Sequence, residues 1–540
     1  MTRPLALASW IACQCCAALL GAAPFNVRDF GARGDGATKD TAAIQKAIDA
    51  AEGQGGGTVL LPAGKYLSGT LHLKSNVALH LSAGATLLAS PDEADFDPYE
   101  KLPFQSVSDR ETTYFHYALL AAENARNIAI VGQGTIDGNR ARRGGPKTIA
   151  IKLCQYVTIR GITVKNSPNY SISFWGTDYI DIDGVTILNG YSDGIDPDAC
   201  RYVRISNCFI DSWDDAICPK ASPSMGMENR RSTEHLTVTN CVLRTSCNNF
   251  KLGTESSGDF KNITFSNCTM LPREKGRRPI SGISIESVDG AHIDGLAISN
   301  VVMEGVGTPI FIRLGNRGRG LNPPVPGSLQ NVSIQNLIAR GSSLASSITG
   351  LTGYPVRRVA LNGINITMEG GGREAKGLDV PEYPEKYPEA TMFGALPAYG
   401  LYARHIEGLT LANFQVRWDK EDLRPALIFD DVKGLALDGF HADTVAGLMP
   451  VLWFHNVEDA LIRGSRAAVA RLFLRVNGPQ SRGIALIGND LTRAERRLEL
   501  LEAPESAVVQ SGNALPASRA RRPPKPPGRR KKPEGFRGAP

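Results

Sequence analysis

Three aspartates stand at matching places in two short strings of this 540-residue chain, and their spacing could support acid and base chemistry. The string SDGIDPDAC contains Asp193, and the string SWDDAICPK contains Asp214 and Asp215. Each aspartate follows a recurring turn residue, Gly184 or Asn207, by seven to nine positions. Folding of such a repeat should stack the three carboxylates, and stacked carboxylates are rarely placed for stability alone.

Carboxylates this close raise one another's pKa, so one can stay protonated near neutral pH while another stays ionised. Such a pair supplies the acid and the base of glycoside hydrolysis. Inverting enzymes separate the two carboxyl groups by roughly 6.5–9.5 Å and retaining enzymes by roughly 5 Å, and the repeat register is compatible with both. A single loop aspartate more often caps a turn. We interpret Asp196 and Asp198 in that way, because they lie beyond the register in the turn string DPD.

The elements that must position these residues are short strands that repeat along the chain. A phrase of alternating apolar residues, a bend and a second short strand recurs, as in VTIRGITV, VRISNCFI and LTVTNCVL, at intervals of 23 to 50 residues. Asn or Gly at the bend suits a left-handed backbone, and the β-branched content argues against a leucine-rich repeat. The pattern predicts an all-β parallel β-helix, with asparagines hydrogen-bonded along a ladder. The bend residues are Gly132, Gly161, Gly184, Asn207, Asn240, Asn267, Asn300, Asn336, Gly363, Asn413 and Gly439.

One amphipathic helix is predicted before the long series of strands. Asp40 can cap it, and the glycine run after residue 52 ends it. A single helix in this place would cover the exposed hydrophobic end of a solenoid. Its apolar face consists of Ile44, Ala47, Ile48 and Ala51.

Composition divides the chain into three parts. Residues 1–22 resemble a secretory signal peptide, which predicts a secreted or periplasmic protein, with a lipid-anchored protein as the second choice. Residues 23–512 are the predicted β-helix domain, and residues 513–540 form a basic, proline-rich tail predicted to be disordered. The net charge of +6 comes from this tail, so composition does not favour a nucleic-acid partner. No later apolar stretch is long enough to span a membrane.

Seven cysteines follow residue 22, an odd number without a CxxC pair. Neither a disulfide framework nor a metal site is therefore predicted. Cys208, Cys241 and Cys268 each follow a bend asparagine, which favours small buried core residues in a stack.

The longest insertion between strand phrases, at about 367–405, is rich in aromatic residues among Gly and Pro. These rings could stack against sugars, or they could pack over the flank of the solenoid, and the sequence leaves both interpretations open. The residues are Tyr383, Tyr387, Phe393, Tyr399 and Tyr402.

Several strings together resemble the polygalacturonase-like glycoside hydrolase family 28 of the pectin-lyase-fold superfamily. They are DFGARGDGATKDTAAIQKAI, GQGTIDGN, NSPNYSISFWG, SDGIDPD and WDDAICPK, and the resemblance covers most of the chain. The resemblance implies a right-handed parallel β-helix and inverting hydrolysis without a cofactor. It also implies that Asp214 is the general acid and that Asp193 and Asp215 position the attacking water.

Two departures from the family pattern concern the substrate. The family usually has GHG in the coil after the paired aspartates, whereas SCNNFKLG here places Asn248 at the histidine, and asparagine cannot titrate. The family's RIK motif, which binds a uronate carboxylate, corresponds to GISIES, with Ser284 and Glu286 in place of Arg and Lys. Replacing two cations with a hydroxyl and an anion would repel a galacturonate carboxylate at that subsite.

We therefore expect either a neutral sugar beside the scissile bond or an acidic sugar held by other cations. Lys251, Arg313 and Arg317 could supply that charge, although Lys220 and Lys251 are more simply interpreted as solvated surface charges. The candidate substrate-binding residues are Asn248, Lys251, Ser284, Glu286 and Arg313.

The predicted function is that of a secreted glycosidase that cleaves a pectin-like or related plant or algal polysaccharide by inverting hydrolysis, with no cofactor and no metal. One alternative is a polysaccharide lyase, which would use a Ca²⁺-binding carboxylate cluster and an Arg or Lys base. Another is a non-catalytic carbohydrate-binding β-helix on a decayed enzyme scaffold.

Overall fold

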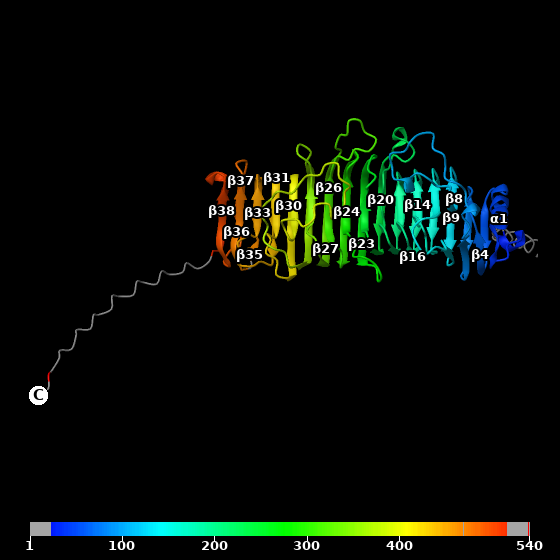
Figure 1. Ribbon diagram of the computed structural model, residues 1–540, viewed down its shortest axis with the longest axis horizontal. Helices are drawn as coiled ribbons and strands as arrows, with labels where there is room; N and C mark the ends of the chain where they lie inside the picture. Colours follow the sequence, from blue (N-terminus) through cyan, green and yellow to red (C-terminus); the bar gives the residue numbers. More distant parts are fainter. Residues whose placement is uncertain (1–22, 468, 516–537, 539–540) are drawn as a thin grey trace, which may run out of the picture.

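The computed structural model describes residues 23–467, 469–515 and 538, and the chain forms a right-handed parallel β-helix (Figure 1). Coil follows coil from β1 (Phe25–Asn26) to β39 (Val508–Ser511), and neighbouring strands pair in parallel. The predicted leader and nearly all of the predicted tail lie outside the described residues. Within the described part of the chain, no helix combines the length and apolar character needed to cross a membrane.

The coils pass through three faces, and in later coils one long strand, such as β23 (Phe260–Pro272), covers the first two. In one coil, β15 (Asp178–Asp183) lies on the first face, β16 (Thr186–Gly190) on the second and β17 (Ile195–Asp198) on the third. Strands of adjacent coils pair residue by residue, as β15 does with β12 (Gln155–Arg160) and β18 (Arg201–Ser206). Residues at the same position in successive coils therefore lie side by side, roughly 4.8 Å apart.

The third face carries the chemistry described below. Its outward side chains alternate with inward Ile, Leu and Phe residues that belong to the core. In the coils around the site its strands are β8 (Ala118–Glu123), β11 (Lys147–Lys152), β14 (Ile172–Trp175), β17, β22 (Asn248–Leu252), β24 (Ser281–Ser287), β26 (Thr308–Leu314) and β28 (Ser346–Thr349).

The bend asparagines form the predicted ladder. Their φ angles lie in the left-handed region, for example 56° at Asn267 and at Asn300. The Asn300 side-chain amide donates to Asn267 over 2.9 Å, and Asn336 donates to Asn300 over 3.1 Å. Asparagine tolerates this backbone and also bonds along the stack, so it fixes the bend in every coil where it occurs.

The predicted small-residue stack inside the solenoid is also confirmed. Cys208, Cys241 and Cys268 are buried in the hydrophobic core and are not joined in disulfides. Each thiol lies near the carbonyl two residues before it, for example Cys208 Sγ at 3.2 Å from the Ser206 oxygen. These cysteines act as small core residues, in line with their position after the bend.

Helix α1 (Thr41–Gly53) covers the N-terminal end of the β-helix, as predicted, and buries the expected apolar face. The capping role expected for Asp40 is wrong in its detail. The carboxylate makes no side-chain bond to the helix and instead accepts hydrogen bonds from the backbone N–H groups of Arg33 at 2.7 Å and Gly34 at 3.0 Å. These two bonds hold the turn at residues 33–34 beside the first residue of α1.

Two segments outside the coils lie over the third face. The N-terminal cover, residues 96–117, precedes β8 and packs Phe115 against Trp175. In Figure 1 it forms the light-blue loop along the upper edge of the solenoid. The C-terminal cover, residues 371–400, joins β29 (Val356–Gly370) to β30 (Leu401–Lys420) and packs its Ala390 and Met392 on Phe311 of β26. Polar side chains on this face are buried because these covers lie above them.

Candidate active site

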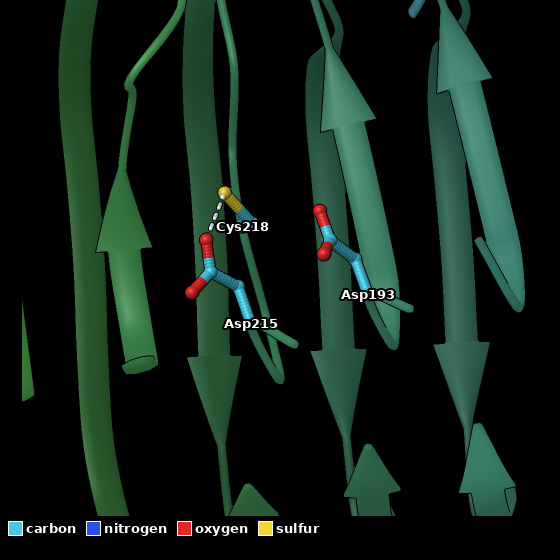
Figure 2. Close-up of side chains that lie close together, drawn as sticks. All are labelled: Asp193, Asp215 and Cys218. Atoms are coloured by element: carbon cyan, nitrogen blue, oxygen red, sulfur yellow. Dashed lines mark hydrogen bonds between the residues drawn. The ribbon is translucent and has the colours of Figure 1, made fainter. Parts of the chain in front are cut away.

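A row of polar side chains crosses the coils where the strands of the third face begin. Bridges pair Ile195 with Ile217 and Ile217 with Phe250, so residues 193, 215 and 248 stand in register, as predicted. Figure 2 shows Asp193 and Asp215 on adjacent coils, pointing to the same side. Carboxylate oxygens of Asp193 and Asp215 lie within 4.8 Å of each other.

Asp214 stands one residue before this row and at its most exposed point. One of its carboxylate oxygens lies within 4.8 Å of an oxygen of Asp215. Its side chain is 27% exposed, against 6% for Asp193 and 8% for Asp215. The three aspartates therefore lie close together. Asp193 and Asp215 form the buried floor of the site, and Asp214 stands at its solvent-facing mouth.

Lys220 forms part of that floor, so the interpretation of Lys220 as a solvated surface charge is wrong. Its ammonium lies 2.8 Å from Asp193 and 2.6 Å from Asp196, and it is almost fully buried. Burial alone would lower the pKa of Lys220, but Asp193 and Asp196 outweigh it and hold this pKa well above its usual range. The ring of Tyr170 lies 4.7 Å from the ammonium.

Asp196 and Asp198 are also not turn residues, because both lie in β17 and are buried. Asp196 pairs with Lys220, and burial raises the pKa of Asp196 to about 6. Asp198 accepts a 2.7 Å hydrogen bond from the backbone N–H of Ser222 and a second bond from its hydroxyl. The string DPD fits a turn by composition, yet here it forms an outward-facing strand supported by the next coil.

Lys251 plays the corresponding part on the next coil, so it too is not a solvated charge. Its ammonium lies 3.4 Å from Asp215 and 3.1 Å from Glu389, a residue of the C-terminal cover. Burial alone would lower the pKa of Lys251, but the charge of Asp215, with that of Glu389, outweighs burial and raises it.

Asp215 is the carboxylate that keeps its charge. Burial alone would raise its pKa, but Lys251 and Lys220 outweigh burial and hold the pKa of Asp215 below its usual range. Asn248 donates to one Asp215 oxygen from its backbone N–H at 3.0 Å and from its amide at 2.8 Å. Asp193 behaves oppositely, because burial and the charge of Asp196 raise its pKa well above the usual range against the pull of Lys220.

The other residues expected to bind substrate lie beneath the cover. Asn248, Ser284, Glu286 and Arg313 are at most 1% exposed, so none presents a polar atom to solvent in this structure. Asn248 instead orients Asp215 and accepts a 2.6 Å bond from Ser281. Arg313 donates to backbone carbonyls of the C-terminal cover, at 2.6 Å to residue 382 and 3.1 Å to residue 383.

Glu286 is neutral rather than repulsive. Burial raises the pKa of Glu286 to about 8, with Glu389 adding to the shift and Lys251 opposing it. Ser284 donates to its Oε1 over 2.6 Å, and its Oε2 has no hydrogen-bond partner among the described residues.

The aromatic residues of the insertion divide between the two interpretations. Tyr399 and Tyr402 are buried in the solenoid flank, whereas Tyr383 and Tyr387 remain about half exposed. The ring of Tyr387 lies 5.6 Å from the Lys251 ammonium and 5.7 Å from the Arg317 guanidinium, beside the carboxylate row. Tyr387 is therefore an exposed aromatic of the insertion that lies beside the carboxylate row.

Three residues of the site escaped the sequence interpretation. Arg143, between β10 (Thr135–Asp137) and β11, lies 2.5 Å from Asp214 and 2.7 Å from Glu111 of the N-terminal cover. Glu389 reaches the row from the C-terminal cover. None of the three lies in a strand phrase, so repeat register could not place them.

Two groups in the row could hold a cation by their geometry, namely Asp193, Asp215 and Cys218, and Asp214, Asp215 and Cys247. Figure 2 shows the first group, with Cys218 Sγ 3.6 Å from Asp215. Buried ammonium groups already pair with Asp193 and Asp215. The positive charge that these carboxylates require is thus supplied by Lys220 and Lys251.

Comparison with known proteins agrees with the β-helix fold and identifies a protein family. The family description "Glycosyl hydrolases family 28" matches residues 57–384. A "Probable polygalacturonase" of Vitis vinifera is 27% identical over 379 residues, covering 65% of this chain and 75% of that protein. An exo-poly-alpha-D-galacturonosidase of Dickeya chrysanthemi is 26% identical over 391 residues, covering 60% and 64%. The solved structure of a hyperthermoactive exopolygalacturonase from Thermotoga maritima has a TM-score of 0.57 at 23% identity, covering 64% of this chain and 88% of that one.

The buried carboxyl of Glu286 predicts a pH-dependent stability. Between its ordinary pKa of 4.5 and the folded value of about 8, the unfolded chain loses this proton while the folded chain keeps it. The free energy of unfolding should therefore fall as pH rises across this window, by up to about 1.4 kcal/mol per pH unit. Glu286→Gln, which keeps the Ser284 bond, should flatten this fall, measured by urea denaturation at several pH values from 5 to 8.

The exposed Glu385→Gln offers a matched control and should denature with the wild-type pH dependence. A Glu286→Gln curve parallel to wild type would show that Glu286 is ionised in the folded protein.

Proposed function

Because the chain belongs to family 28 of the glycosyl hydrolases, we propose that it hydrolyses a pectic-type polysaccharide with Asp214 as general acid and Asp193 and Asp215 around the attacking water. The protein is a polygalacturonase-like glycosidase. The observation that carries the residue roles is the row itself, in which Asp193 and Asp215 occupy one register on adjacent coils and Asp214 stands beside them.

Asp215 suits the role of general base. Its low pKa keeps it ionised over the range in which an enzyme of this kind works, and an ionised carboxylate can take a proton from water. Its Oδ1 accepts two bonds from Asn248, and its Oδ2 lies 3.4 Å from the Lys251 ammonium. The nearest oxygens of Asp214 and Asp215 lie within 4.8 Å, a separation that taken alone corresponds to retaining geometry. We favour activation of water over direct attack because both oxygens of Asp215 are held by Asn248 and Lys251.

Asp214 suits the role of general acid. It is the most exposed of the three carboxyls, and only an exposed group can reach the oxygen of a bound glycosidic bond. Asp214 gives its proton to the leaving oxygen, water adds its hydroxyl to the anomeric carbon, and Asp215 takes the remaining proton. The two carboxyls then exchange their protons with solvent, which completes the hydrolysis.

Chain-end attack is part of the proposal. Glu389 of the C-terminal cover contacts Asn248 and Lys251, one coil beyond Asp215. Adjacent coils are about 4.8 Å apart, so a polymer lying along the solenoid axis meets the cover one coil beyond Asp215 on that side. Beyond the ends of β22 and β26, Asp109 of the N-terminal cover lies 3.0 Å from Arg319, which continues to Glu255 at 3.2 Å. A site closed in this way suits the end of a chain.

The lyase alternative is less well supported. A lyase of this fold would bind Ca²⁺ through carboxylates, but Lys220 and Lys251 already pair with Asp193 and Asp215. The non-catalytic alternative is also weaker, because Asn248 and Glu286 support the row instead of disrupting it.

We further propose export, based on the leader sequence, since a polysaccharide is met outside the cell.

The acid role of Asp214 is tested by leaving-group dependence. Asp214→Asn should lower kcat on an oligosaccharide by about 10²–10⁴-fold, because no proton reaches the leaving oxygen. On a nitrophenyl glycoside of the same sugar, whose leaving group needs no proton, the loss should largely disappear. Asp215→Asn should lose activity on both substrates, and the exposed Asp379→Asn should lose neither.

Steady-state kinetics on both substrates give these ratios, and an Asp214→Asn enzyme with wild-type kcat on the oligosaccharide would remove Asp214 from the acid role.

The closed site predicts exo action, measurable as the product distribution over time. Chromatography of early digests of a long pectic chain should show one small product from the first minutes, with little loss of viscosity. A ladder of intermediate oligomers at low conversion would mean that the polymer crosses the covers, and chain-end attack would then be wrong.

A further inference from the structure

Arg143 pairs with Asp214, the residue proposed above as the general acid. Arg143 Nη1 donates to Asp214 Oδ2 over 2.5 Å, while its Nε and Nη2 donate to the two Glu111 oxygens over 3.2 and 2.7 Å. The charges of Glu111 and Asp214 outweigh burial and raise the pKa of Arg143. The guanidinium thus bridges the N-terminal cover and the catalytic row.

This ion pair cannot persist during the reaction proposed above. The pair requires the carboxylate form of Asp214, whereas proton donation requires the carboxylic acid. Arg143 must therefore leave Asp214 when the substrate binds, and the released Nη1 can then donate to another anion.

We propose that Arg143 binds the carboxylate of an acidic sugar on the leaving-group side of the scissile bond, and that this exchange frees Asp214 to act as the acid. The inference rests on the proposed function and names its substrate as a uronate-containing chain. It replaces the expectation of a neutral sugar at this place. Arg143 here determines specificity by touching the substrate, and Glu111 positions it.

The other cations near the row are poorly placed for this task. The side chains of Lys220, Lys251 and Arg317 are at most 9% exposed, and each is paired with an aspartate. Arg313 is bound to backbone carbonyls under the C-terminal cover. Arg143 is 45% exposed, so an incoming carboxylate can reach it without uncovering a buried charge.

Glu111 makes the exchange geometrically simple. Two parallel bonds from Nε and Nη2 hold the guanidinium in one plane, which leaves Nη1 directed at the mouth of the site. A small rotation of Arg143 can therefore move Nη1 from Asp214 to a sugar carboxylate while the bonds to Glu111 persist. Asp214 then takes a proton from solvent and passes it to the leaving oxygen.

The test compares substrate charge. Arg143→Gln should lower kcat/KM on oligogalacturonate by about 10- to 100-fold, because one charge-assisted hydrogen bond to the sugar is lost. On the same oligomer with its carboxyl groups reduced to alcohols, this variant should match or exceed the wild type, because Asp214 no longer has to be released. Arg143→Lys should fall between, since it keeps the charge without the planar fork.

The neighbouring Arg142→Gln is the matched control: Arg142 is exposed in the same loop, and its variant should behave as wild type on both oligomers. Equal losses on both oligomers, or no loss on oligogalacturonate, would overturn the proposal. Failure of the hydrolytic proposal itself is separate, because it would appear as wild-type turnover by Asp214→Asn.

Discussion

Two buried ammonium groups allow the carboxylates of this site to crowd together. Asp193, Asp196 and Asp215 are almost fully buried, and unpaired charges in such a place would cost several kcal/mol each. Lys220 pairs with the first two and Lys251 with the third. Asp215 stays ionised because Lys251 and Lys220 outweigh burial, whereas burial and Asp196 raise the pKa of Asp193 against the pull of Lys220.

The coils supply the register of this arrangement, and the two covers supply its environment. Without the C-terminal cover, Glu286 and Lys251 would face solvent, and neither pKa would shift as it does. The same covers bring in Glu111 and Glu389, which contact Arg143 and Lys251. Catalytic geometry therefore comes from the regular part of the fold, while the electrostatics and access come from the irregular parts.

The features that follow from the sequence repeat could be predicted from the sequence alone. The bend asparagines, the cap helix and the alignment of Asp193 with Asp215 follow from periodicity, and each is present. The burial of Lys220 and Lys251 was not predictable, because it depends on segments that have no repeat. The prediction that Asp196 is a turn residue failed for a related reason. The string DPD favours a turn locally, but pairing with the next coil and the bond from Lys220 place Asp196 in a strand.

The pH dependence of kcat/KM tests the central claim, that Lys251 keeps Asp215 ionised. In the wild type, the acidic limb should lie below the usual range of an aspartate. Lys251→Met should move that limb upward by about 1–3 pH units, while Lys251→Arg, which keeps the charge, should leave it near the wild-type position. Lys220, Asp193, Asp214 and Glu389 also face this carboxylate and remain unchanged in both variants. An acidic limb that stays in place in Lys251→Met would contradict the account.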